Sequence, residues 1–270
     1  MLKSLVAGNI ARYRKAKRLT QEELGKMLGV TYQAVSKWET EQAMPDIVIL
    51  PQLADILQIS VDKLLGYYPP VPTSGRYDAL YGNEEYYMGV NPTSECLKVI
   101  SLIPPNKHMK LLELCCGEGR NAVFFARCGY EVSAMDLIDA GIEKTKRLAD
   151  IANVNVNAFK ADINDYRLDT KYDILFSNGA FHYINPELRD EIITNYRDYT
   201  NTDGINAFNV FIEKPFVDKA PDIDEHSSPW LSGQLLLFYH DWLVEDFSEY
   251  IEDCTTGSKY AVNQIYARKK

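Results

Sequence analysis

The sequence lacks several features that would assign it to specialised classes of protein. No apolar run approaches the ~18 uninterrupted residues that a membrane-spanning helix needs, which excludes a helical integral membrane protein. No charged-then-apolar leader opens it, so we expect a cytoplasmic protein. Its five cysteines are odd in number and show no C-x-x-C spacing, which argues against a disulfide framework or a zinc ribbon. We expect reduced thiols and no metal site.

The chain as a whole also has no excess of basic residues, but its charge is distributed unevenly along the sequence. The 270 residues carry a net charge of −9 and are 46% hydrophobic, enough for a small module joined to a larger globular domain. Residues 1–40 hold eight Lys or Arg against three Glu, a balance of +5, so the rest must sum to −14. This asymmetry is typical of a basic binding module joined to an acidic body, although a basic helix face is also found as plain solvated surface.

Residues 1–66 show apolar positions at helical spacings, separated by short polar breaks, and we predict about five short helices. Thr20 followed by Glu23 forms a capping box, in which the hydroxyl accepts from a free amide while the carboxylate reaches back. A helix is therefore predicted to begin at Gln21.

A second helix is predicted directly after the first. Gly29 can adopt the left-handed conformation that closes a helix, and Thr31 can cap the next one, from Tyr32 to about Thr40. Two short helices joined by a tight glycine-containing turn form a helix-turn-helix.

The stretch LTQEELGKMLGVTYQAVSKWETEQAMPD resembles the helix-turn-helix of the Cro and lambda-repressor type, the xenobiotic-response-element family of bacterial regulators. The resemblance extends over residues 4–66, including LADILQISVDKLLG, and implies a transcriptional regulator module that binds double-stranded DNA. It implies that Tyr32, Gln33 and Lys37 face the major groove, and that Gln21 and Thr31 position phosphates. Because one such module reads a half-site, we expect a homodimer.

One departure from that family concerns the turn after the recognition helix. Thr40-Glu41 replaces the usual Asn-Gly, and an acid there would weaken a nearby phosphate contact without changing the fold. The alternative interpretation of this domain is that the bundle only dimerises or tethers the larger domain.

Residues 67–91 are predicted to be a linker and cap segment. Prolines and a Ser-Gly pair in its first half indicate a hinge. Four tyrosines in its second half are too many for a plain linker. They either lie over a pocket mouth or pack against their own domain: Tyr77, Tyr81, Tyr86 and Tyr87.

Residues 92–270 alternate short apolar runs with amphipathic helical stretches. This alternation predicts an α/β fold with a doubly wound parallel sheet, in which ligands bind at the carboxyl ends of the strands. The predicted strands include MKLLEL, YEVSAM, NVNAFKA, YDILFSN and GINAFNVFI, and helices are predicted over 119–129, 138–152 and 186–199. The segments DWLVEDFSEYIED and KYAVNQIYARKK then predict a C-terminal antiparallel hairpin.

The first strand, loop, helix and second strand of this sheet are LLELCCGEGRNAVFFARCGYEVSAMD, residues 111–136. Gly117 and Gly119 allow the loop to approach a ligand closely. Asp136 ends the second strand, where its carboxylate can bind the two hydroxyls of a ribose. The pattern therefore predicts a ligand that contains a ribose.

Two nucleoside ligands compete at this point. Residues 117–122 fit G-x-G-x-x-A, the dinucleotide fingerprint, although that match is weak alone. Glu113 would repel a pyrophosphate but can bind the ammonium of a methionine moiety through water. Asp162, after the third strand, is placed to accept from an adenine amine. With the C-terminal hairpin, these features favour S-adenosylmethionine.

The stretch 92–270 resembles the class I S-adenosylmethionine-dependent methyltransferases, and within them the tellurite-resistance type, through GEGRNAVFFARCGYEVSAMD, YDILFSNGAFHYI, LLLFYHDWLVEDFSE and YARKK. The resemblance implies a Rossmann-like methyltransferase sheet with S-adenosyl-L-methionine as cofactor. The cofactor-binding residues that it implies are Glu113, Cys115, Gly117, Gly119, Asn121, Asp136, Leu137, Asp162, Ile163 and Ser177.

Cys115 departs from this family, because it stands where the first glycine of the loop motif belongs. We expect it to need an ordinary backbone conformation and to crowd the methionine tail, which would weaken cofactor binding. The adjacent Cys115 and Cys116 are either a soft-metalloid site or, more simply, two small buried residues.

Methyl transfer needs positioning and desolvation more than a fixed set of catalytic groups. A soft nucleophile needs no base, whereas a hydroxyl or amine acceptor does. The catalytic candidates are His182 and Tyr183, just past the fourth strand, and Glu213 after the fifth; a lone His near a strand end is also commonly structural. Residues 218–233 are predicted to be a lid, with Trp230 as an apolar wall and His226 as a weaker candidate.

Residues 67–270 carry 31 acidic against 20 basic residues, which favours a small-molecule acceptor over nucleic acid. Three hypotheses remain open from the sequence. The chain is a methyltransferase fused to a DNA-binding module, a regulator whose sheet domain only senses S-adenosylmethionine or a product, or a sensor that binds a nicotinamide cofactor in the same loop.

Overall fold

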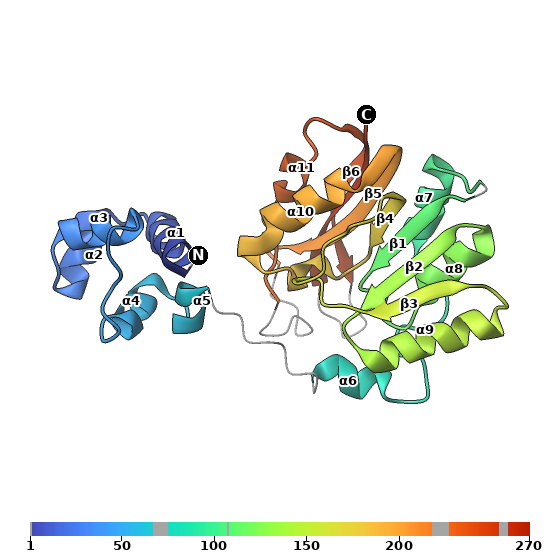
Figure 1. Cartoon of the computed structure of the whole chain (residues 1–270), viewed down its shortest axis with the longest axis horizontal. Coiled ribbons are helices and arrows are strands. Elements are labelled where there is room, and N and C mark those ends of the chain that lie inside the picture. The colour runs from blue at the N-terminus through green and yellow to red at the C-terminus, as the bar shows by residue number, and fades with distance from the viewer. Residues whose placement is uncertain (1, 67–74, 107, 218–226, 254–258) are drawn as a thin grey trace. The chain divides into compact units, whose positions relative to one another are not determined.

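The computed structural model describes residues 2–66, 75–106, 108–217, 227–253 and 259–270 (Figure 1). The chain divides into two compact units, Met1–Val71 and Pro72–Lys270, which we call the helical unit and the sheet unit. The hinge predicted within the linker lies outside the described residues. The cap part of that segment, from Gly75 onward, belongs to the sheet unit.

The described part of the helical unit, residues 2–66, contains five helices, as the sequence predicts: α1 (Leu2–Ala16), α2 (Gln21–Leu28), α3 (Tyr32–Glu39), α4 (Leu50–Leu57) and α5 (Val61–Leu65). Their apolar faces share one core, which includes the fully buried Ile10, Leu24 and Val35. Burial of such a side chain contributes about 1.5–3 kcal/mol, so this core holds the helix-turn-helix of α2 and α3 together.

The predicted caps of α2 and α3 are confirmed. The Thr20 hydroxyl accepts from the Glu23 amide at 3.1 Å, and a Glu23 carboxylate oxygen accepts from the Thr20 amide at 2.7 Å. Gly29 has φ +69°, the left-handed conformation that only glycine adopts without strain. Thr31 accepts from the Ala34 amide at 3.3 Å. Local sequence therefore fixes both ends of the turn.

A buried ion pair joins α1 to the end of α3. The Arg14 guanidinium donates to both Glu39 carboxylate oxygens, at 2.6 and 2.9 Å. It also donates to the Leu19 carbonyl at 2.6 Å, and the Gln21 amide donates to Glu39 at 2.8 Å. The charged side chains are only 10% and 7% exposed, so each charge depends on the other for its partner.

The sheet unit has seven strands in the order β3-β2-β1-β4-β5-β7-β6. They are β1 (Lys110–Leu114), β2 (Glu131–Asp136), β3 (Val156–Lys160), β4 (Tyr172–Ser177), β5 (Thr200–Ile212), β6 (Leu243–Asp253) and β7 (Lys259–Arg268). The first five pair in parallel, and β7 pairs antiparallel with both β5 and β6. The predicted doubly wound sheet with an antiparallel hairpin is confirmed.

Helices cover both faces of this sheet (Figure 1). One face packs against α7 (Ser94–Leu102), α8 (Arg120–Cys128) and α9 (Asp139–Ile151), and the other against α10 (Arg189–Asp198) and α11 (Gln234–Leu237). The helix predicted over 186–199 begins instead as a short 3₁₀ turn at Pro186–Leu188, because proline fits a first helical turn. Two buried cores result, one on each face.

Two further short elements lie outside this alternation. α6 (Arg76–Tyr81) packs against α9, and the 3₁₀ turn η1 (Phe181–Tyr183) follows β4. No helix among the described residues is long and apolar enough to cross a bilayer.

Candidate active site

The loop between β1 and α8 forms the centre of the site. β1 is an apolar strand buried from Leu111 onward, and the loop that leaves it contains Gly117 and Gly119, with φ of +56° and +85°. A Cβ atom on Gly117 would lie 2.9 Å from the Tyr81 hydroxyl, and one on Gly119 would lie 2.6 Å from Thr145. Both positions therefore need glycine, for conformation and for space.

Glu113 lies at the end of β1, just before this loop. Its carboxylate is 2% exposed, and one oxygen accepts from the Asn121 side-chain amide at 3.1 Å. The other oxygen has no hydrogen-bond partner among the described residues. Burial raises the pKa of Glu113 to about 8, against the opposing hydrogen bond from Asn121. An unpaired buried carboxylate oxygen is costly, and a bound cation would satisfy it.

Asp136 ends β2 beside the same loop and is 7% exposed. One carboxylate oxygen accepts from the Gly117 amide at 2.8 Å and the other from the Ile138 amide at 3.0 Å. Burial raises the pKa of Asp136 to about 6, and these two hydrogen bonds oppose the rise. Asp136 therefore holds the glycine loop in place and still has lone pairs for a ligand.

The other predicted cofactor residues surround this pair. Asn121 holds Glu113 through its amide, while its oxygen accepts from the Thr93 amide at 2.9 Å, so it orients Glu113 from within the protein. Asp162 follows β3 and accepts from the Asn164 amide at 2.8 Å. Leu137 is half-buried, Ile163 is buried in the core, and Ser177 is buried at the end of β4.

The expectation that Cys115 adopts an ordinary backbone conformation is wrong. Its φ is +58°, so the loop keeps the left-handed geometry of the glycine that the family has there. For a residue with a Cβ this conformation costs roughly 1–2 kcal/mol. Packing against the buried cluster around Leu114 and Tyr196 maintains it.

Replacement of Cys115 by glycine is expected to give a protein about 1 kcal/mol more stable than replacement by alanine. Both variants lose the sulfur atom, but only alanine keeps the strained Cβ. Glycine loses more backbone entropy on folding, and this loss offsets part of the relief of strain. Urea denaturation of the two variants measures the difference. Equal midpoints and slopes would show that the loop carries no strain at this residue.

The catalytic candidates lie at the carboxyl ends of β4 and β5. His182 is 3% exposed, and its Nδ1 atom has no hydrogen-bond partner among the described residues. Burial, together with the nearby Arg189 charge, lowers the pKa of His182 to about 3. A base works best with a pKa near the working pH, so this imidazole stays neutral and is a poor proton acceptor. Glu213 is exposed after β5, and Tyr183 is half-buried.

Aromatic rings form a continuous row across these strand ends. The His182 ring lies 4.2 Å from Tyr183 and stacks on Phe211 at 4.6 Å, and Phe211 stacks on Tyr260 at 4.7 Å. At the other end of the row, Tyr77 of α6 meets Tyr183 edge-on at 6.3 Å. These centroid distances are those of favourable ring contacts. All of the rings except His182 are half-buried, so the row forms an aromatic wall.

The residues predicted to contact DNA lie around α3 in the helical unit. Tyr32, Gln33 and Lys37 are exposed on α3, while Val35 and Trp38 face the core. Thr31 is exposed as the α3 cap. The predicted phosphate contact Gln21 differs, because its amide already donates to Glu39.

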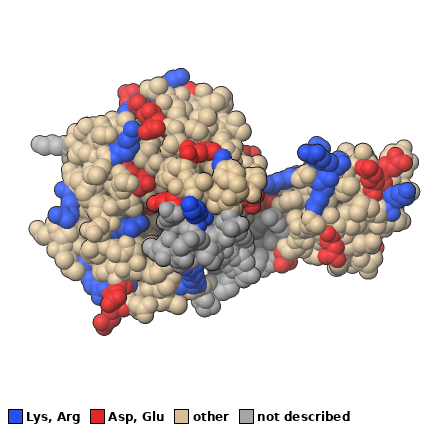
Figure 2. Space-filling view, turned by 180° about the vertical axis from the view of Figure 1, so that it is seen from behind, with Lys and Arg blue, Asp and Glu red and all other residues tan. Residues whose placement is uncertain are grey.

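The turn after α3 keeps the geometry of a glycine. Glu41, at the departure from the family's Asn-Gly, has φ +62°. Figure 2 shows basic and acidic side chains interspersed on the visible face of both units.

Comparison with known proteins identifies both units. The model of the family described as "Tellurite resistance protein TehB" matches residues 79–265, more than half of the chain. The chain belongs to the TehB family. A helix-turn-helix family model matches residues 10–64.

Individual TehB relatives match the sheet unit. The Haemophilus influenzae protein named "Probable S-adenosyl-L-methionine-dependent methyltransferase TehB" is 29% identical over 144 residues, which are 53% of this chain and 48% of that protein. The chain therefore spans about half the length of this relative. The crystal structure of TehB from Haemophilus influenzae superposes with a TM-score of 0.60 at 24% identity, covering 73% of this chain and 67% of that one.

A separate relative matches the helical unit. The Bacillus subtilis protein named "Uncharacterized HTH-type transcriptional regulator YqaE" is 37% identical over 57 residues, which are 21% of this chain and 49% of that protein. The TehB unit and the helix-turn-helix unit thus have their relatives in different proteins.

The prediction that Trp230 forms an apolar wall of a lid is wrong for this TehB-family chain. Trp230 is fully buried, and its indole nitrogen donates to the Phe181 carbonyl at 2.9 Å. The Arg189 guanidinium lies 4.3 Å from its ring centroid, a cation–π contact. Trp230 is therefore part of the core between β5 and α10. His226 and most of the predicted lid lie outside the described residues.

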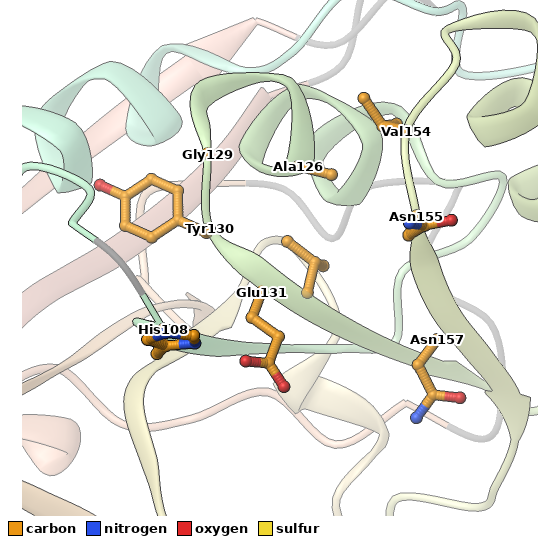
Figure 3. A pocket seen from close by; sticks show the side chains of 9 residues that line it. His108, Ala126, Gly129, Tyr130, Glu131, Val154, Asn155 and Asn157 are labelled. Carbon is orange, nitrogen blue, oxygen red and sulfur yellow. The ribbon is translucent and has the colours of Figure 1, made fainter.

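A surface cavity of about 520 Å³ lies at the opposite edge of the sheet (Figure 3). It is lined by residues at the amino ends of β1, β2 and β3, among them His108, Tyr130, Glu131, Asn155 and Asn157. Ligands of doubly wound sheets bind at the carboxyl ends, so this cavity is separate from the TehB-family site. Among the described residues, no cluster of His, Cys, Asp or Glu could hold a metal ion.

Of the two residues that contact the glycine loop from outside, sequence reasoning offered the first as one of two alternatives and missed the second. Tyr81 is 6% exposed and lies on Gly117, and a buried lysine, Lys144, pairs with the loop residue Glu118 at 2.7 Å. The run of tyrosines was the signal for the first. Nothing in the sequence pattern of α9 marks Lys144 as buried.

Proposed function

We propose that the sheet unit is an S-adenosyl-L-methionine-dependent methyltransferase of a small molecule, and that the helical unit binds DNA as a regulator module. The observation that carries the enzymatic part is the pair of buried acids beside one glycine loop. Glu113 has an unpaired oxygen, and Asp136 faces the loop from β2. Bound S-adenosylmethionine would supply an activated methyl group.

The residues present fit this cofactor better than a dinucleotide. The unpaired Glu113 oxygen suits an ammonium group, which the methionine part carries. Once ionised, the same buried carboxylate would repel a pyrophosphate held at the loop, whereas an ammonium favours that ionised form. Asp136 would hold the ribose hydroxyls, and Asp162, after β3, would accept from the adenine amine. The printed name of the Haemophilus influenzae relative agrees with this choice.

The chain would act mainly by holding and desolvating its reactants. Correct placement of two reactants can supply about 7–11 kcal/mol of a barrier. The neutral His182 ring, stacked on Phe211 and in tilted contact with Tyr183, contributes to the row of rings and not to proton transfer. An acceptor that reacts here therefore needs no protein base, as is true of a thiolate or another soft nucleophile.

The acceptor is proposed to be a small molecule because the wall that would receive it is aromatic. The ring row runs from Tyr77 to Tyr260 across the strand ends. A macromolecular nucleic-acid substrate needs a basic track for its phosphates. On the visible face of the sheet unit, charges of both signs are interspersed instead (Figure 2).

The helical unit would give the protein a second ligand, double-stranded DNA. Tyr32, Gln33 and Lys37 are exposed together on α3, the recognition helix of this motif. A homodimer would present two such helices to two half-sites about one turn apart. Light scattering with and without DNA tests this; a monomer under both conditions would contradict it.

Calorimetry with the purified full chain tests the cofactor. S-adenosylhomocysteine should bind, and NAD should not bind at the same concentrations. Preferential binding of NAD would overturn the assignment. The competing hypothesis is a sensor, in which the sheet unit binds the cofactor but transfers no methyl group. It predicts that S-adenosylhomocysteine changes DNA affinity while no thiol, amine or hydroxyl acceptor from a broad panel is methylated.

Binding of S-adenosylhomocysteine at pH 7 is expected to release close to one proton. The raised pKa of Glu113, about 8, means that the free protein holds this carboxyl mostly protonated at pH 7. An ammonium beside it favours the ionised form. Affinity should therefore fall as pH drops below 8, by up to about tenfold per pH unit.

Calorimetry in two buffers of different ionisation enthalpy measures this proton. At pH 7, Asp136, with a pKa of about 6, is already mostly ionised and adds little. The control is Glu113→Gln, which should bind more weakly and show the same enthalpy in both buffers. Identical enthalpies in the unsubstituted protein would exclude the ammonium contact.

A further inference from the structure

A buried ion pair connects the glycine loop to the segment that precedes α7. Lys144 of α9 donates to a Glu118 carboxylate oxygen at 2.7 Å, and the two residues are 6% and 2% exposed. Lys144 also donates to the Glu85 carbonyl at 2.6 Å. The second Glu118 oxygen accepts from the Met88 amide at 3.0 Å. We call residues 84–88 the strap.

Further contacts fix the strap along its length. Arg120, the first residue of α8, donates to the Met88 carbonyl at 2.9 Å. The Tyr86 hydroxyl donates to the Lys144 carbonyl at 3.2 Å, and the Tyr86 ring lies 5.3 Å from the Lys144 ammonium and 5.6 Å from the Arg147 guanidinium. The strap therefore binds to the loop and to both helices that flank it.

Stability alone does not account for this ion pair. The cost of removing two charges from water commonly equals or exceeds their attraction, so a buried pair is weak grounds for inferring stability. The pair instead fixes the position of the strap. Lys144 donates a hydrogen bond to the Glu85 carbonyl, and Glu118 accepts one from the Met88 amide. Glu118 itself lies between the two glycines of the loop, with positive φ on either side.

The strap follows directly after the helix that carries Tyr81. Tyr81 ends α6, three residues before the strap begins, and its hydroxyl is 2.9 Å from the position of a Cβ on Gly117. α6 packs against α9, the helix that carries Lys144. Tyr81 thus covers the loop at Gly117.

We propose that Lys144 and Glu118 are positioning residues, which hold the strap and Tyr81 against the glycine loop and thereby set the affinity and the release rate of the cofactor. This inference rests on the proposed function, because it concerns the same loop. It assigns a role to Glu118, the residue between the two glycines, whose side chain is buried in the protein.

The test compares two variants of the full chain. Lys144→Met leaves the Glu118 charge buried and unpaired, which will destabilise the protein. The double variant Lys144→Met with Glu118→Gln removes both charges, and its thermal midpoint should recover toward that of the unsubstituted protein. If the pair only balances charge, the double variant should also recover its affinity for S-adenosylhomocysteine.

Under the positioning role, affinity should not recover with stability. We expect the double variant to bind S-adenosylhomocysteine about tenfold more weakly and to release it correspondingly faster in stopped-flow displacement. Hydrogen exchange at residues 84–88 should rise as well. Lys146→Met is the matched control, because Lys146 lies on the same helix in an exposed pair with Glu143, and it should change none of these quantities.

The outcomes separate this inference from the proposed function. If the unsubstituted protein binds no S-adenosylhomocysteine, the proposed function fails and the positioning role fails with it. If that protein binds the ligand, and the folded double variant binds it equally tightly, only the positioning role is overturned.

Discussion

Replacement of Asp136 by alanine is expected to weaken binding of S-adenosylhomocysteine by about 100-fold or more. A hydrogen bond to a charged group contributes about 1.5–3 kcal/mol, and two ribose hydroxyls would lose such a partner. The substitution also removes the carboxylate that accepts from the Gly117 and Ile138 amides. The loop would then lose part of its fixed geometry, which adds to the loss of affinity.

Asp139→Ala is the matched control for this experiment. Asp139 is a nearby aspartate at the start of α9, but its side chain is 75% exposed and pairs with Lys160 at 2.7 Å. Its replacement should leave calorimetric affinity unchanged. Asp136→Asn keeps one acceptor oxygen and should fall between the two. Unaltered affinity for S-adenosylhomocysteine in a folded Asp136→Ala protein would contradict the proposed ribose contact and the cofactor assignment that depends on it.

Replacement of Arg14 by methionine is expected to destabilise the helical unit by about 3–5 kcal/mol. The substitution leaves the Glu39 carboxylate buried without its partner and leaves the Leu19 carbonyl without a donor. Whole domains are stable by only about 5–15 kcal/mol. Much of the helical unit should therefore unfold at low denaturant concentration, and DNA binding should be lost with it.

Urea denaturation followed by helical circular dichroism measures this loss in the full chain. The double variant Arg14→Met with Glu39→Met should regain most of the stability, because no charge is then left unpaired. Lys15→Met, at the exposed neighbouring position on α1, should have little effect. Since the sheet unit has its own core, S-adenosylhomocysteine affinity should stay constant in all three variants. A loss below 1 kcal/mol in Arg14→Met would show that Glu39 is solvated.

Features set by local sequence could be predicted well. The Thr20 capping box and the closing Gly29 depend on residues within one or two turns, and both are present as expected. The strand, glycine loop and helix around Gly117 follow from the same kind of pattern. Alternation of apolar runs with helical stretches was sufficient for the parallel sheet and its antiparallel hairpin, since each element buries a predictable face.

Features set by distant contacts could not be predicted. Residue spacing cannot show that the Asn121 side chain is hydrogen-bonded to Glu113 and Thr93, or that Trp230 lies in the core against Arg189. The left-handed backbone of Cys115 was missed for a related reason. Its conformation is imposed by the loop around it, and the loop's geometry prevails over the preference of a single side chain.

The strand order has a consequence for how the protein is made on the ribosome. β7 lies between β5 and β6 although it follows both of them in the sequence, so β6 can join the sheet only when β7 is in place. Until residues 259–268 have been translated, β5 has an unpaired edge and β6 lacks the strand that it pairs with among the described residues, and unpaired strands can pair with other chains. The helical unit, translated first, can fold long before that moment. During synthesis the helical unit would thus be folded while the sheet unit, with the aromatic row at its strand ends, still lacks β7.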